Sequence, residues 1–285
     1  MEKTTQNSYH THISSKHNAL ELKLDEVWRY RDLILLFTKR NFVVRYKQTI
    51  LGPAWILLNP LFSSIIYAIV FGGIAKIGTE GIPTILFYLC SNAIWLFFAT
   101  CVTTNAQTFT NNADVFGKVY FPRLTMPISN MLSAGIHFCV QMLLVLGFLG
   151  FYLVQGAVHP NWAAWLLIPV VLLHLGMLGL GCGIIVSSLT TKYRDLAILV
   201  DFAMQLWMYA TPVVYPLSTL EPGWIRTILL INPVTAPVEF FRYAILGQGS
   251  ILPWVLALSW AITIGVMLIG IVIFNKVERT FMDTV

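Results

Sequence analysis

Charged side chains are scarce in this chain. Only 11% of its 285 residues are Asp, Glu, Lys or Arg, whereas 57% are hydrophobic, and the mean hydropathy is +0.73. A water-soluble domain carries about 25% charged residues, so this composition excludes one and is typical of a protein embedded in a bilayer. Little sequence outside the apolar segments is left over for a soluble domain.

The chain also lacks a phosphate-binding loop. No segment of the form G-x-x-x-x-G-K-S/T occurs, and Gly117 and Lys118 are followed by Val119 without the required earlier glycine. If ATP drives the activity, its energy must come from another polypeptide. We therefore expect no cofactor in this chain, with ATP and Mg bound by a partner.

Two further features are missing. The first fifty residues contain no apolar core followed by a small-residue cleavage site, so we expect the first apolar segment to act as the insertion signal. No pair of cysteines has C-x-x-C spacing, which favours buried thiols over disulfides or metal ligands. The four cysteines are Cys90, Cys101, Cys139 and Cys182.

Six apolar segments are each long enough to cross a bilayer, which takes about 20 residues per helix. They cover residues 53–75, 82–104, 126–154, 162–189, 196–215 and 251–274. These segments are apolar all round, which favours helices over the short alternating strands of a barrel. We predict an all-α integral membrane protein with a polar tail over 1–26, an amphipathic interface helix over 27–50, a six-span domain over 51–276 and a tail over 277–285.

The basic residues are distributed unevenly between the two sides of the predicted spans. Of 18 Lys and Arg residues, only Lys76, Arg226 and Arg242 fall in the loops of one side. Because cytoplasmic loops carry the excess of positive charge, we expect both termini to be cytoplasmic. The net charge of +5 is explained by this topology, so no nucleic-acid partner follows from it.

Apolar and basic side chains recur with helical periodicity between residues 27 and 47, each on its own face. This pattern indicates a basic amphipathic helix in the membrane interface. Arg45 and Lys47 then reach the depth of lipid headgroups, where an anionic phosphate sits. A plain topological anchor is the alternative.

Two other segments lie between spans. Residues 112–123, NADVFGKVYFPR, are polar and basic without catalytic chemistry, so we interpret them as a cytoplasmic handle for another protein. Residues 216–250 are apolar but broken by prolines and glycines, and their helical pieces, Trp224–Ile231 and 236–246, are too short to span. We predict a re-entrant pair on the external side, with Glu239 and Arg242 paired three residues apart. An ordinary amphipathic loop is the alternative.

Aromatic side chains are concentrated in WLFF at residues 95–98 and QLWMYATPVVYP at residues 205–216. Aromatic faces with hydrogen-bonding tips suit sugar rings, so a conduit lined in this way would let a glycan pass. Most other aromatic residues are assigned to interfacial belts and helix packing.

Ionisable groups at membrane depth are rare. Asp201 is the only charged residue within the six predicted spans, and His137 and His174 have no acidic partner at helical spacing. An ion- or proton-coupled transporter or channel for a small solute needs such groups, so it is the weaker alternative. A membrane enzyme is also disfavoured, because Asp114, Asp195 and Glu221 lie in separate segments without a partner.

Five motifs, taken in order, resemble the permease subunit of ATP-binding-cassette exporters of polysaccharides such as O-antigen, capsule and teichoic acid. They are RYKQTILGPAW (45–55), FGKVYFPRL (116–124), KYRD (192–195), QLWMYATPVVYP (205–216) and NPVTAPVEFFRYAILG (232–247). The resemblance covers residues 27–274. An exporter of the same build for drugs or simple lipids is the closest alternative.

The resemblance implies a homodimer in the cytoplasmic membrane of a bacterium, joined to two copies of a separate ATPase, that moves a glycan on undecaprenyl diphosphate. ATP-driven closure of the partners would push the coupling helices and open a channel along the dimer axis. It assigns ATPase coupling to Asn112, Asp114, Val115, Phe116, Lys118, Tyr120, Phe121, Pro122, Arg123, Tyr193, Arg194 and Asp195. The resemblance assigns the lipid diphosphate to Arg40, Arg45 and Lys47, and the external gate to Asn232, Pro233, Pro237, Glu239, Phe240 and Arg242. The two aromatic motifs themselves suggest a glycan channel lined by Trp95, Phe97, Phe98, Trp207, Tyr209 and Tyr215.

Overall fold

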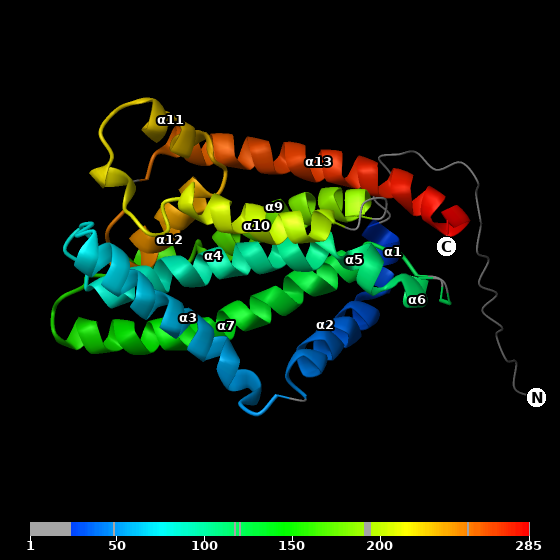
Figure 1. Cartoon of the computed structure of the whole chain (residues 1–285), viewed down its shortest axis with the longest axis horizontal. Coiled ribbons are helices and arrows are strands. Elements are labelled where there is room, and N and C mark those ends of the chain that lie inside the picture. Colours follow the sequence, from blue (N-terminus) through cyan, green and yellow to red (C-terminus); the bar gives the residue numbers. More distant parts are fainter. Residues whose placement is uncertain are drawn as a thin grey trace, which may run out of the picture.

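The computed structural model describes residues 24–47, 49–116, 118–119, 121–190, 195–249 and 251–284, and helices are the only regular elements among them (Figure 1). In chain order they are α1 (Leu24–Arg29), α2 (Arg31–Tyr46), η1 (Gly52–Ala54), α3 (Trp55–Tyr67), η2 (Ala68–Ile74), α4 (Thr84–Ala106), α5 (Thr108–Asn111), α6 (Ala113–Phe116), α7 (Thr125–Val154), α8 (Trp162–Trp165), α9 (Ile168–Thr190), α10 (Leu196–Tyr209), η3 (Leu217–Thr219), α11 (Trp224–Ile231), α12 (Thr235–Leu246) and α13 (Pro253–Thr284).

Five of the predicted spans are confirmed as helices long and apolar enough to cross a bilayer. They are Gly52–Ile74, Thr84–Ala106, Thr125–Val154, Ile168–Thr190 and Pro253–Val277. The predicted span at residues 196–215 is shorter than expected, since α10 has 14 residues and turns at Ala210. The bent pair of α11 and α12 brings the number of candidate spans to six if it counts as one.

The long helices form a bundle whose two ends differ (Figure 1). The short helices α5 and α6 and the end of α13 lie at one end, which we name the α6 end, and α11 and α12 lie at the other, the α12 end. Helix α4 is central, with 78% of its apolar window buried, compared with 17% in Gly52–Ile74 and 22% in α7. The other helices pack around α4 and leave apolar faces outward.

Close contact between α4 and α9 depends on glycines in α9. A Cβ atom at Gly183 would lie 2.4 Å from the Cβ of Asn105, and one at Gly179 would lie 2.6 Å from the Cβ of Cys101. In a bilayer the hydrophobic effect does not drive helices together, so they associate through close packing. Small residues allow the helix backbones to approach closely enough for it. The glycine-rich segment of α9 is therefore a packing surface within one subunit.

Asparagine side chains join three helices at the α6 end. Asn130 on α7 accepts a hydrogen bond from Asn41 Nδ2 on α2 at 2.9 Å and donates to Asn105 Oδ1 on α4 at 3.2 Å. Amide groups can donate and accept at once, so one residue can link two neighbours. This network holds α2 against the bundle.

The two short helices predicted after residue 216 are present. Helix α11 has the predicted bounds, α12 begins one residue earlier than predicted, and their axes meet at 85°. Pro233 lies between them, and Gly247, at a φ of 75°, ends α12 in the left-handed conformation that favours glycine.

Candidate functional site

Aromatic side chains anchor the segment at residues 112–123 to the bundle. Phe116 and Phe121 are 3% and 4% exposed, and their ring centroids are 5.6 Å apart. Phe121 also lies 5.6 Å from Phe37 on α2, and Phe116 lies 5.9 Å from Phe109 on α5. The guanidinium of Arg123 lies 5.7 Å from the Phe116 ring centroid and is buried as well. These contacts fix the segment at the α6 end.

Phe116, Phe121 and Arg123, which are predicted to take part in ATPase coupling, are buried within the subunit. The surface of the segment is formed instead by Asp114, Lys118 and Val119, and Val119 is 60% exposed. Sequence reasoning did not include Val119, although it stands between two predicted residues. Among the other predicted coupling residues, Asn112, Val115 and Pro122 are half-buried, Asp195 is exposed at the start of α10, and Tyr120, Tyr193 and Arg194 lie outside the described residues.

Of the three predicted headgroup ligands, Arg40 is partly engaged. Its Nη2 donates to Asn112 Oδ1 at 3.2 Å, and its guanidinium lies 4.9 Å from the Phe37 ring centroid. Arg45 and Lys47 are exposed near the end of α2. Arg40 therefore links α2 to the segment at residues 112–123, and it is less exposed than Arg45 and Lys47.

Tyr46 follows Arg45 on α2. Burial raises the pKa of the Tyr46 phenol, and the neighbouring Arg45 charge opposes that rise. The Arg45 side chain also hydrogen-bonds to the Tyr46 hydroxyl, which again opposes the rise of this pKa.

The aromatic residues predicted to line a channel divide into two groups. Trp95, Phe97 and Phe98 are at most 4% exposed and belong to the main hydrophobic core, so in this structure they pack the bundle and line no conduit. Trp207 is half-buried and packs edge-on against Phe98, with centroids 5.2 Å apart. Tyr209 is 51% exposed and Tyr215 is half-buried, so both can contact a molecule outside the subunit.

Polar side chains that sequence reasoning did not assign are exposed on α3 and α10. On α10 they are Asp201 and Gln205, one turn apart. On α3 they are Asn59, which is exposed, and Ser63, which is half-buried. Their four-residue spacing on each helix was the available sequence signal, because residues i and i+4 share a helix face.

The predicted gate residues at the α12 end form hydrogen-bonded contacts. Asn232 accepts from Trp207 Nε1 at 3.1 Å and donates to the Ala210 carbonyl oxygen at 2.7 Å, which ties the start of α12 to the end of α10. The Pro233 carbonyl oxygen accepts from Ser259 Oγ on α13. Pro237 and Phe240 are buried on α12.

Glu239 and Arg242 form a buried ion pair on α12, as their spacing predicted. Glu239 is 3% exposed and Arg242 is fully buried. The Leu217 N–H donates to Glu239 Oε1 at 3.4 Å, and Arg242 Nη1 donates to the Tyr215 carbonyl oxygen at 3.4 Å. The pair thus ties α12 to the segment that follows α10.

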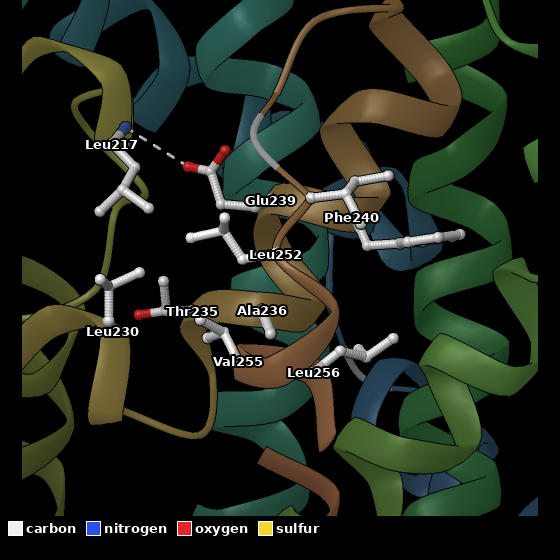
Figure 2. A pocket seen from close by; sticks show the side chains of 10 residues that line it. Leu217, Leu230, Thr235, Ala236, Glu239, Phe240, Leu252, Val255 and Leu256 are labelled. Carbon is white, nitrogen blue, oxygen red and sulfur yellow. Dashed lines mark hydrogen bonds between the residues drawn. The ribbon is translucent and has the colours of Figure 1, made fainter. Parts of the chain in front are cut away.

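A crevice beside Glu239 is too small for cargo. Figure 2 shows it between Glu239, Leu217 and apolar side chains of α12 and α13, and its volume is about 10 Å³, room for about one water molecule. A wider groove of about 560 Å³ lies outside it, between residues 75–78 and the segment that carries Tyr215 and α11. Lys76 in its wall has a φ of 51°, uncommon for a residue with a side chain.

Comparison with known proteins adds independent information. A model of the family described as ABC-2 type transporter matches residues 32–246, from α2 to the end of α12. Two proteins from Klebsiella pneumoniae named O-antigen export system permease protein RfbA are 27% and 28% identical to this chain, over 88% of it and 94% of their own length. A protein of the same name from Myxococcus xanthus is 29% identical over 76% of this chain and 81% of its own length.

Proposed function

Because the chain belongs to the ABC-2 type transporter family, we propose that it is the membrane subunit of an ATP-driven polysaccharide exporter. Such a subunit is a permease and not an enzyme, since ATP is hydrolysed by a separate ATP-binding subunit. The observation that carries the choice of cargo is the similarity to O-antigen export permeases over 88% of the chain and nearly their whole length. The cargo is then an O-antigen-like polysaccharide on a lipid diphosphate carrier such as undecaprenyl diphosphate.

We assign the α6 end to the cytoplasm of a bacterium and the α12 end to the outer side of its cytoplasmic membrane. The excess of Lys and Arg outside the α12 end supports this orientation. Helix α2 is then the interface helix, and α11 and α12 are a re-entrant pair that forms the external gate. The buried Glu239 and Arg242 pair supports a semi-buried position for α12.

The coupling surface for the ATPase is proposed to be the exposed part of residues 112–123 together with Asp195. Asp114, Lys118 and Val119 would contact the partner, while Phe116 and Phe121 transmit its push to the bundle. Arg45 and Lys47 would hold the lipid diphosphate at the cytoplasmic surface, because cations at headgroup depth attract phosphate. Two copies of the chain would enclose the glycan path, with Tyr209 and Tyr215 near its outer end.

The test is export in a bacterium that makes a lipid-linked polysaccharide but has lost its own exporter. The chain is co-expressed with its partner ATPase, and surface polysaccharide is measured by antibody binding to intact cells. Polysaccharide should reach the surface with the active ATPase and accumulate inside with a hydrolysis-deficient ATPase. Surface polysaccharide that does not depend on ATP hydrolysis overturns the proposal. Flipping of a fluorescent phospholipid without any polysaccharide export would identify a simple-lipid exporter instead.

A further inference from the structure

Asp201 has an unusual position for a charged residue. It lies on α10, about 8 Å along the helix from its first residue, and its side chain is exposed. In the described helices α3, α4, α7, α9 and α10 it is the only Asp, Glu, Lys or Arg. A carboxylate at this depth is costly when it faces lipid, and such residues face water or another polar group.

The exposed face of α10 is divided into a polar and an apolar edge. Asp201, Gln205 and Tyr209 follow one another at four-residue spacing and are all exposed. Phe202 and Leu206, which are 56% and 55% exposed, form the apolar edge beside them. The apolar edge suits lipid or helix packing, and the polar edge suits water.

Helix α3 also carries polar side chains at this spacing. Asn59, Ser63 and Tyr67 also follow at four-residue spacing. At the α12 end, α3 and η2 contact α10, since Tyr67 Oη donates to the Met208 sulfur at 3.5 Å and the Phe71 and Tyr209 ring centroids are 6.5 Å apart.

Helix α4 lies between α3 and α10 (Figure 1) and packs against both. Its half-exposed residues include Thr100 and Thr103. Hydroxyl, amide and carboxylate groups thus occur at exposed or half-exposed positions of three neighbouring helices.

We infer that the polar edges of α3 and α10 line a water-filled glycan path and that Asp201 makes this path selective for uncharged polysaccharide. The inference rests on the proposed function and specifies its substrate class. Sugar hydroxyls can donate to the Asp201 carboxylate and the Gln205 amide, whereas an acidic sugar meets a like charge. In a symmetric dimer the Asp201 carboxylate occurs twice. Charges of one sign that line a passage strengthen the electrostatic potential inside it.

A thiol-reactivity experiment tests the charge without any cargo. Gln205→Cys is made in a chain whose native cysteines are replaced by Ala, and the complex with its ATPase is placed in lipid nanodiscs. Reaction rates are measured with a cationic trimethylammonium and an anionic sulfonate methanethiosulfonate reagent. The cationic reagent should react faster, and adding Asp201→Asn should lower the ratio of the two rates about tenfold, as expected for unit charges about 6 Å apart in water.

The matched control is Leu206→Cys, on the adjacent apolar edge, which should react with neither reagent. If Gln205→Cys is equally unreactive, the polar edge does not face water and the inference is wrong. If the ratio does not change with Asp201→Asn, the carboxylate does not set the charge of the path. Unchanged melting temperatures of the variants show that the labelling reports the folded complex.

A second measurement addresses the cargo. Surface export of a neutral lipid-linked mannan and of a hexuronic acid polymer of similar length is compared in cells. The native chain should export the mannan at least fivefold better, and Asp201→Asn should lower this ratio by raising export of the acidic polymer. Equal export of both polymers by the native chain overturns the selectivity. If neither polymer is exported with an active ATPase while the labelling ratio responds to Asp201, the proposed function fails and the charge assignment stands.

Discussion

Arg242 is the largest side chain that the described fold buries completely. Its charge is compensated by Glu239 on the same helix, and its guanidinium lies 4.8 Å from the Phe87 ring centroid on α4. Glu80 contributes a further favourable charge interaction, and Glu80 Oε1 accepts from Ser218 Oγ. Arg242 thus connects α12 to α4, to the segment that carries Glu80 and to the segment that carries Tyr215.

Replacing this arginine should destabilise the folded subunit. In Arg242→Met the buried Glu239 carboxylate loses its counter-charge, and breaking a buried pair costs about 3–5 kcal/mol. Thermal unfolding of the purified protein in detergent, followed by loss of the monodisperse peak, measures the change. The double variant Glu239→Gln, Arg242→Met should melt higher than Arg242→Met alone, and a lower or equal value would show that the pair is not the source of the loss.

At the scale of elements, the contact between α4 and α9 depends on the absence of side chains at a few positions. A Cβ at Gly183 would also lie 3.0 Å from the Val102 carbonyl oxygen, an atom of the α4 backbone that cannot rotate away. The glycines of α7 differ, because a Cβ at Gly147 or Gly150 meets no atom within 4 Å.

This difference predicts opposite responses to the same substitution. Gly183→Ala should destabilise the bundle by about 1–3 kcal/mol, because the extra methyl forces α4 and α9 apart. Gly150→Ala, the matched control, should leave the melting temperature unchanged or raise it, since alanine favours the helix and meets no neighbour. Thermal unfolding in one detergent compares them, and equal melting temperatures would contradict the close packing.

The same scale shows which elements could be predicted from sequence. Span length is a strong constraint on composition, so five spans and the short pair after residue 216 were located correctly. The early end of α10 at Ala210 and Thr211 was not, although Pro212 follows directly and a proline disfavours a helical conformation of the residue before it. Their turn is held by Asn232, 22 and 21 residues further along, whose Nδ2 donates to the Ala210 carbonyl oxygen and to Thr211 Oγ1. These hydrogen bonds connect positions far apart in the chain, so no local pattern predicts them.

The sequence predicts which residue types form the candidate site better than it predicts which way their side chains point. The aromatic and basic composition of residues 112–123 marked the segment, but only the fold shows that Phe121 faces Phe37 on α2 while Val119 faces outward. Likewise Trp95 and Phe98 are chemically suited to sugars, yet their positions on the central helix α4 bury them. Burial of an aromatic residue depends on its neighbours in space, which the linear sequence does not display.

At the scale of the whole molecule, the proposed work of the subunit depends on the outward face of residues 112–123. Lys118→Glu and Val119→Asp should each lower ATPase stimulation of the assembled complex at least fivefold without changing the melting temperature of the permease, because both residues are exposed. Phe121→Asp should lower both the ATPase stimulation and the melting temperature of the permease, since it places an unpaired carboxylate among buried rings.

The control for these variants is the charge reversal Lys76→Glu at the α12 end, which should leave stimulation unchanged. ATP hydrolysis by the reconstituted complex and unfolding of the permease are measured in parallel. Full stimulation of ATP hydrolysis with Val119→Asp and with Lys118→Glu would show that the coupling surface does not lie on this segment.

The hydrogen bonds from Arg40 to Asn112 and from Asn41 to Asn130 have a thermodynamic consequence. The first joins the helix that carries Arg45 and Lys47 to the segment proposed to contact the ATPase, and the second joins the same helix to α7, so the two proposed sites are linked through α2. Under linkage, if nucleotide binding changes the affinity for the lipid diphosphate by some factor, the lipid must change the affinity for nucleotide by the same factor. If nucleotide binding raises the affinity for the lipid carrier, arrival of the carrier at the inner leaflet raises the affinity of the complex for ATP.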